Sequence, residues 1–287
     1  MDTLQADATA TYHPADKASG DLRRTALHTL CLTDPADKCT QARALWAQAP
    51  QCALDPQTEL SGEALAAAVP GRPAQPRLIE PAQVPQRSVH TPAGRAALLH
   101  AICHIEFNAI NLALDAVWRF AGMPHAFYLD WLRVAAEEAY HFTILHELLQ
   151  SLGHSYGDFD AHDGLWAMCE KTRDDVTARM ALVPRTLEAR GLDATPLIQG
   201  KLRKVGSPDA LQAVELLDII LRDEVGHVAI GNHWYRWLCE RQGLDPVPHY
   251  RHLARLHSAP RLKPPFNDEA RRRAGFSELE LDYLHGS

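Results

Sequence analysis

Four long segments with helical periodicity occupy residues 91–243, and they constrain the fold more than any other feature of the chain. The four run from Thr91 to Gly122, from about His125 to Leu152, from about Leu165 to Arg190, and from Ser207 to near Gly243. Thr91 and Ser207 are N-cap residues followed by proline, and Gly153 is suited to end the second segment. A helix of about 25 residues is about 40 Å long, which is the scale of a four-helix bundle. The segments therefore predict an all-α bundle, with a kink or division at Pro184.

The flanking regions differ from the bundle in composition. Residues 70–92 contain six prolines, which exclude a helix and favour an extended arm lying on the bundle, with a flexible linker as the alternative. Asp34 and Pro35 begin a short helix before the arm. We therefore divide the chain into a helical N-terminal extension with a proline-rich arm (1–90), a bundle (91–243) and a C-terminal tail packed on it (244–287). The tail contains one short helix near "NDEARRRAG" and another near "SELELDYL".

Net charge, cysteine spacing and the length of apolar runs disfavour several classes of protein. The formal net charge of −7 does not favour a nucleic-acid surface, although Arg271, Arg272 and Arg273 form a local basic patch suited to phosphate contact. The six cysteines form no C-x-x-C pair, so we expect reduced thiols in a cytoplasmic protein. The polar, acidic N-terminus is not a signal peptide, and no apolar run approaches the roughly 18 residues that span a bilayer.

A Glu-x-x-His motif occurs twice, once on the second predicted helix and once on the fourth. The copies are Glu138 with His141 and Glu224 with His227, and a spacing of three places each pair on one helical face. The preceding helices each supply one more glutamate. These are Glu106, which lies among isoleucines and alanines, and Glu188, within "PRTLEARG". A single motif of this kind usually belongs to a solvated face, but an ionised Glu106 in an apolar stripe would need a partner.

Four carboxylates and two imidazoles suit two transition-metal ions, of which iron is the first expectation and manganese or a mixed manganese–iron pair the alternatives. The predicted metal ligands are Glu106, Glu138, His141, Glu188, Glu224 and His227. Glu137 and Asp223 each precede a motif glutamate, and we expect each to accept the free ring N–H of a histidine across the bundle. Tyr140 is a candidate redox-active residue, with simple packing as the alternative. His100, His104, His146 and His233 fall off the ligand face and are excluded.

The motifs also carry a family resemblance. The segments "EEAYHFTILHELLQSLGHSYGDF", "VPRTLEARGLDATP", "RDEVGHVAIGNHW" and "KPPFNDEARRRAGF", with the arm "GRPAQPRLIEPAQVP", resemble the bacterial ferritin-like family known as domain of unknown function 455. More distantly, the design is similar to that of tRNA-modifying di-iron hydroxylases. The resemblance implies a ferritin-like bundle with the six ligands named above.

These expectations lead to three readings of function. The first is a di-iron oxidase or monooxygenase that uses O2, acts on a small molecule and takes electrons from an external donor. The second is a ferroxidase or iron-handling protein without a storage cage, because the long arms disfavour a cage. The third is a structural or interaction protein that keeps the bundle without activity, which the complete ligand set disfavours. A tRNA-modifying hydroxylase is a narrower form of the first hypothesis, and the acidic balance disfavours it. We expect a monomer or homodimer with no membrane association.

Overall fold

The computed structural model describes residues 20–286 except 61 and 63, and it is all-α as predicted. Within these residues β-structure is limited to two isolated bridges, Asp21 with Ala53 and Leu78 with Ala161. The predicted N-terminal extension is described from residue 20 onward, so residues 1–19 of that prediction lie outside the described part.

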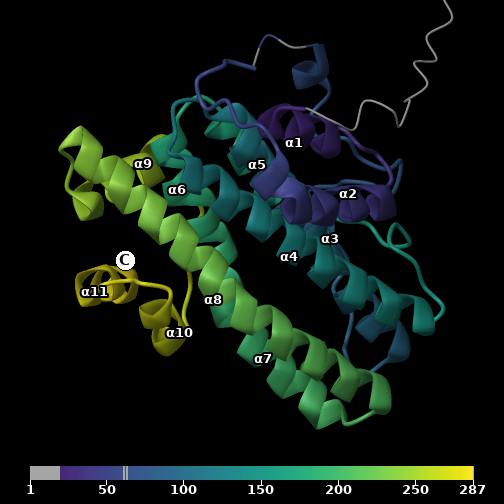
Figure 1. The fold of residues 1–287 in the computed structure, drawn as a ribbon. Coiled ribbons are helices and arrows are strands. Elements are labelled where there is room, and N and C mark those ends of the chain that lie inside the picture. Colours follow the sequence, from purple (N-terminus) through teal and green to yellow (C-terminus); the bar gives the residue numbers. More distant parts are fainter. Residues whose placement is uncertain (1–19, 61, 63, 287) are drawn as a thin grey trace, which may run out of the picture.

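The long helices and the short elements around them are shown in Figure 1. The α-helices are α1 (Leu22–Leu30), α2 (Pro35–Gln48), α3 (Pro92–Arg119), α4 (His125–Ser151), α5 (Gly164–Lys171), α6 (Val176–Leu182), α7 (Ala189–Val205), α8 (Pro208–Gln242), α9 (Pro246–Leu256), α10 (Asp268–Arg273) and α11 (Glu278–Gly286). Short 3-10 turns are η2 (Ala49–Gln51), η3 (Ala64–Ala68) and η4 (Pro81–Gln83), and η5 (Val183–Glu188) is a π-helical segment.

The bundle consists of two helix pairs. Helix α3 packs along α4 and α7 along α8, and the two pairs meet mainly through α4 and α8. The Thr91 side chain accepts a hydrogen bond from the Gly94 amide at the start of α3, as its predicted capping role requires. Arg95 of α3 forms an ion pair with Asp209 in the first turn of α8, which joins one end of the two pairs.

The third predicted helix has different limits in the structure. It is interrupted after α5, restarts at α6 with the Asp175 side chain accepting from two backbone amides, and continues through η5 and α7 to Val205. The predicted end at Gly191 was wrong, because one interior glycine costs a helix only about 1 kcal/mol. Leu192, Thr195 and their successors along the same face are buried and continue the packing. The helix ends at Gly206, whose φ of 69° is the left-handed conformation of a C-terminal cap.

Pro184 divides the bundle helix, as predicted. Proline has no N–H to continue the helical ladder, and the chain passes through the six-residue η5 before regular helix resumes. The Thr186 hydroxyl donates to the Ala181 carbonyl five residues earlier, at 2.8 Å. On the facing helix, a Cβ atom at Gly231 would lie 2.7 Å from Pro184 Cβ. Glycine at 231 therefore allows α8 to approach η5 this closely.

The N-terminal extension is attached to the bundle by two buried basic side chains. Arg23, on α1, donates to the carbonyls of Val117 and Trp118 at 3.3 and 2.8 Å, where the last turn of α3 leaves acceptors free. Lys38, on α2, is fully buried and donates to Gly71 O at 2.7 Å and to Asn111 Oδ1 at 2.6 Å. Lys38 thus joins α2, the arm and α3 at one point.

The proline-rich arm is extended and lies along the bundle, which agrees with the first of its two predicted states. Arg72 forms an ion pair with Asp163 at 2.8 Å in the connection between α4 and α5. Ala161 in the same connection accepts from the Ile79 amide and donates to the Arg77 carbonyl. These two backbone hydrogen bonds fix the arm to the connection between α4 and α5, in the manner of two paired strands.

The C-terminal tail folds against α6 and α8 and contains both predicted short helices, α10 and α11. Helix α9 was not predicted, because the prolines of this segment argued against a helix. Pro246 and Pro248 both lie in its first turn, where a missing N–H breaks no intrahelical bond. The Asp245 side chain caps this turn by accepting from the Val247 amide at 3.0 Å.

Helix α3 is long and apolar enough to cross a membrane by length and composition, so the prediction that no segment reaches this limit was wrong by that measure. However, 72% of its most apolar stretch is buried inside the bundle. Its apolar character is that of a helix packed on several sides.

The contact between Gly231 and Pro184 predicts that the stability of the protein is sensitive to substitution of Gly231. We expect Gly231→Ala to destabilise the protein by about 1–3 kcal/mol, because the added methyl group overlaps the proline ring. Gly226→Ala on the same helix is the control, since a Cβ there meets nothing within 4 Å and alanine favours helix. Thermal unfolding of both variants measures the difference. Equal melting temperatures would show that η5 and α8 are not held as closely as described.

Lys38 predicts a pH dependence of stability. Burial lowers the pKa of Lys38 from 10.5 to about 7, so between these values the unfolded chain binds a proton that the folded protein does not. Stability therefore rises with pH through this window, on the order of 1.4 kcal/mol per pH unit while the difference is a full proton. We expect the urea midpoint of the natural protein to rise relative to that of Lys38→Met between pH 7.5 and 9. Parallel midpoints would contradict the assignment.

Candidate metal centre

Four of the six predicted ligands form one compact group in the middle of the bundle. Glu106 of α3, Glu138 and His141 of α4, and Glu224 of α8 each place one oxygen or ring nitrogen so that all four atoms lie within 4.8 Å of one another. All four side chains are buried. The consecutive helices α3 and α4 and the more distant α8 therefore bring their polar groups to one point inside an apolar core.

The two histidines face this group through the same ring atom. His141 Nδ1 lies 3.3 Å from Glu138 Oε2 and 3.4 Å from Glu106 Oε2. His227 Nδ1 lies 2.9 Å from Glu138 Oε1 and 3.7 Å from Glu224 Oε1. Glu138 therefore places one carboxylate oxygen beside each imidazole, which is the position of a bridging group.

Glu188 lies outside the compact group of four but faces it from η5. Burial is the main cause that raises the pKa of Glu188 well above its ordinary value, and the nearby charges of Glu224 and Glu138 add to it. Both of its carboxylate oxygens are buried and have no hydrogen-bond partner. Glu188 is the last residue of the π-helical segment η5, so the direction of its side chain depends on the geometry of that segment.

The outer nitrogen of each histidine contacts an acid on the opposite helix. His141 Nε2, on α4, lies 3.2 Å from Asp223 Oδ2, on α8. In the reciprocal contact, His227 Nε2, on α8, lies 2.7 Å from Glu137 Oε2, on α4. When the neutral imidazole donates its Nε2–H to the outer carboxylate, the Nδ1 lone pair is directed at the glutamates. Glu137 and Asp223 therefore each lie beside a histidine of the facing helix.

The electrostatics of the cluster show how its charges balance in the absence of a cation. Burial raises the pKa values of Glu106 and Glu224 above their ordinary range, and the charge of Glu138 adds to both shifts. Glu138 behaves in the opposite way: burial opposes ionisation, but His227 and His141 hold its pKa well below its usual range. Burial also opposes the charge on His141, yet Asp223, Glu106 and Glu138 raise its pKa to about 12. Glu106 and Glu224 therefore ionise readily only when a positive charge lies close to them.

The buried side chains could bind a metal ion. Both carboxylate oxygens of Glu188 and Oε2 of Glu224 are buried without hydrogen-bond partners, and such groups are costly unless something binds them. Four carboxylates would neutralise two divalent cations, and two imidazoles add one nitrogen ligand for each ion. The same donor set is the known pattern of di-iron and di-manganese bundles. The buried glutamate–histidine group is therefore suited to bind metal.

Tyr140 lies beside the cluster rather than in it. Its side chain is 39% exposed, and its ring centroid is 6.3 Å from that of His141. It is not a packed core tyrosine, and its redox role stays a prediction.

The excluded histidines have other partners. His104 Nδ1 lies 2.8 Å from the Tyr156 hydroxyl, and His100 Nε2 accepts from the Gly157 amide at 2.9 Å. His146 lies against Phe142, and His233 against Trp234. None of these histidines is in the compact group of four.

Sequence reasoning missed the residue that allows Glu188 to reach the cluster. Gly231 lies against Pro184, the second residue of η5, and the two residues are related only through this contact in space. The glycine is separated from Pro184 by most of two helices, so no local signal in the sequence pairs the two.

Comparison with known proteins gives a family and no assigned activity. A protein from Haemophilus influenzae, named "Uncharacterized protein", is 51% identical over 220 residues, which is 74% of this chain and 75% of that protein. No solved structure matches. The family model described as "Protein of unknown function (DUF455)" matches residues 31–282, including every residue of the cluster. The chain therefore belongs to the DUF455 family, as its motifs had indicated.

Proposed function

We propose that the protein is a dimetal-carboxylate oxidoreductase of ferritin-like type, an O2-dependent oxidase or monooxygenase acting on a small molecule. One observation carries the proposal: four buried glutamates and two buried histidines from α3, α4, η5 and α8 converge, with carboxylate oxygens left unpaired. A packed apolar core would not retain such a group without a ligand, because burial of unpaired carboxylates is unfavourable by several kcal/mol.

Each side chain has a defined task in this proposal. Glu138 would bridge the two metals, since its oxygens lie beside both imidazoles. Glu106 and His141 would hold one metal, and Glu188, Glu224 and His227 would surround the other. Asp223 and Glu137 would fix the tautomer of the histidines through their Nε2 atoms. The surrounding apolar side chains limit water at the cluster, and the bound metals would supply the reduction of O2.

Iron is the proposed metal, with manganese or a mixed manganese–iron pair as alternatives. A set of four carboxylates and two imidazoles contains no thiolate, which disfavours softer metals such as Cu(I). Electrons would come from an external donor. We further propose a cytoplasmic protein that acts as a monomer or homodimer.

Metal content tests the site directly. We expect the protein reconstituted with ferrous ion under argon to hold two iron ions per chain by elemental analysis. Glu138→Ala should hold fewer than one, because the removed carboxylate contacts both halves of the cluster. Glu147→Ala, an exposed residue on the same helix, should retain two. No bound transition metal in the reconstituted natural protein would refute the proposal.

Oxygen consumption then separates the function classes. An oxidase or monooxygenase should consume O2 in a fixed ratio to the two bound irons, and should turn over when a donor is supplied. Ferroxidase activity without a cage would appear as continued oxidation of added ferrous ion by a monomer or dimer. A growing mineral core, followed by light scattering, would instead indicate storage and contradict the oxidoreductase assignment.

The outer carboxylates give a finer prediction. Asp223→Asn preserves the shape of the side chain but removes the negative acceptor from His141, so ferrous ion affinity should fall by about 10- to 100-fold. Competition with a chromogenic chelator measures the change. Asp218→Asn on the same helix is the control, since that residue contacts Gln199 and lies away from the histidines. Equal affinities for the two variants would show that Asp223 is only a surface charge.

A further inference from the structure

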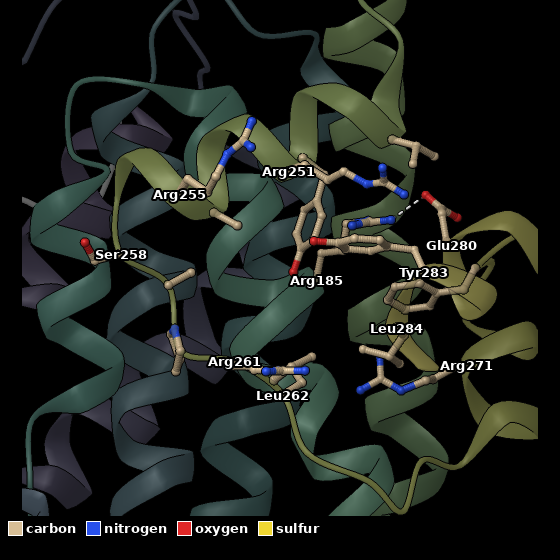
Figure 2. Close-up of a pocket in the computed structure, with 16 residues that line it drawn as sticks. Arg185, Arg251, Arg255, Ser258, Arg261, Leu262, Arg271, Glu280, Tyr283 and Leu284 are labelled. Atoms are coloured by element: carbon tan, nitrogen blue, oxygen red, sulfur yellow. Dashed lines mark hydrogen bonds and ion pairs between the residues drawn. The ribbon is translucent and has the colours of Figure 1, made fainter. Parts of the chain in front are cut away.

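A second site-like feature lies at the C-terminal side of the bundle, in a cavity of about 560 Å³. Its walls come from α9, the segment that follows α9, α10 and α11, with Arg185 of η5 at the base (Figure 2). The volume is in the range of sites for small organic ligands. None of the six cluster residues lines it, so it is separate from the candidate metal centre.

The cavity is strongly basic in a chain whose net charge is −7. Five arginines line it against a single acid, Glu280. The arginines are Arg185, Arg251, Arg255, Arg261 and Arg271. Two are neutralised within the fold, Arg185 by Glu280 and Arg271 by Asp193 at 2.6 Å. For the other three, no carboxylate of the described residues lies within ion-pair distance. The mouth of the cavity therefore carries an uncompensated positive charge.

The Arg185 guanidinium at the base of the cavity is buried and held between aromatic rings. Its side chain is 3% exposed, and its guanidinium carbon lies 4.6 Å from the Tyr250 ring centroid and 4.9 Å from that of Phe276. Aromatic stacking of this kind holds the guanidinium in one orientation. Its Nε atom is buried with no hydrogen-bond partner, although its terminal nitrogen reaches Glu280. Arg185 is therefore a fixed part of the cavity wall, and the exposed Arg251 and Arg261 are the donors that a ligand would reach.

Aromatic side chains complete the lining. Tyr250, Phe276 and Tyr283 all face the cavity, and the Arg251 guanidinium carbon lies 4.1 Å from the Tyr283 ring centroid. Figure 2 shows Arg251 and Arg185 extending toward Glu280 from different elements, with Tyr283 beside them. Arginines supply planar donors for phosphate, and aromatic faces supply stacking surface for a planar ring.

We propose that this cavity binds a nucleoside monophosphate or an organic phosphate of similar size that carries a planar ring. The phosphate would contact Arg251 and Arg261, while the ring would pack on Tyr250 and Tyr283. The cavity is small and its deepest arginine is buried, which favours a discrete small molecule over a nucleic-acid strand. Ligand binding in this cavity does not require metal, so its test is independent of the test of the proposed function.

Calorimetric titration of the full chain at low salt tests the proposal. The probes are the four ribonucleoside monophosphates, adenosine without phosphate, and inorganic phosphate. We expect saturable binding of at least one monophosphate, tighter than either half-probe, because both the ring and the phosphate contribute. The double variant Arg251→Gln with Arg261→Gln should weaken that binding about tenfold or more. Both arginines are exposed, so the fold should persist, and its melting temperature checks this.

Arg43→Gln is the matched control, since Arg43 is an exposed arginine on α2, far from the cavity in the sequence. Tyr283→Leu should weaken nucleotide binding while leaving inorganic phosphate unchanged, which separates stacking from charge. Several results would overturn the proposal: no saturable binding of any monophosphate at millimolar concentration, equal losses in the control and the double variant, or binding of folded tRNA alone. The last result would identify a nucleic-acid surface in place of a small-molecule site.

Discussion

The convergence of six buried ionisable side chains is the constraint on which the rest of the structure depends. Placing Glu138 and its partners in an apolar core is unfavourable unless their charges are matched by protons or cations at close range. The helices that supply these groups cannot slide relative to one another without breaking the match. The position and orientation of α3, α4 and α8 are thus tied to a polar cluster as much as to apolar packing.

The irregular third helix is a consequence of the same constraint. A regular helix through Pro184 would lose a hydrogen bond and meet the proline ring, so the chain adopts η5 and restarts. Segments of this kind often occur at functional sites because they reorient a side chain relative to its neighbours. Here Glu188 ends the segment and faces the cluster. Gly231, on α8, leaves room for Pro184 of η5. The helix that appears least regular is therefore the one that brings the fourth carboxylate to the others.

The segment η5 also divides two environments of opposite charge. Glu188 faces the acidic cluster, whereas Arg185, three residues earlier, forms the base of the arginine-lined cavity between α9 and α11. The net charge of the chain does not reveal this separation, because the acids of the cluster are buried and the arginines gather at a separate cavity. Net charge alone gave no reason to expect an anion site, and the basic run Arg271–Arg273 was only a partial indication: Arg271 is buried and paired with Asp193.

Much of the fold and of the candidate centre could be predicted from local signals. Caps, prolines and terminal glycines mark α3, α4 and α8, since they act on the backbone within one turn. The spacing of Glu138 with His141 and of Glu224 with His227 follows from helical periodicity alone, as does the position of Glu137 and Asp223 one residue earlier. What periodicity cannot determine is which surfaces meet. The continuation of the third helix past Gly191, the helix that begins with Pro246, and the approach of Gly231 to Pro184 depend on packing between distant segments, which offsets weak local preferences. The sequence by itself determined the helices and the chemical character of the ligands. Only the tertiary structure decided that η5 carries Glu188 to the cluster and Arg185 to a separate cavity, because both outcomes rest on contacts between residues far apart in the chain.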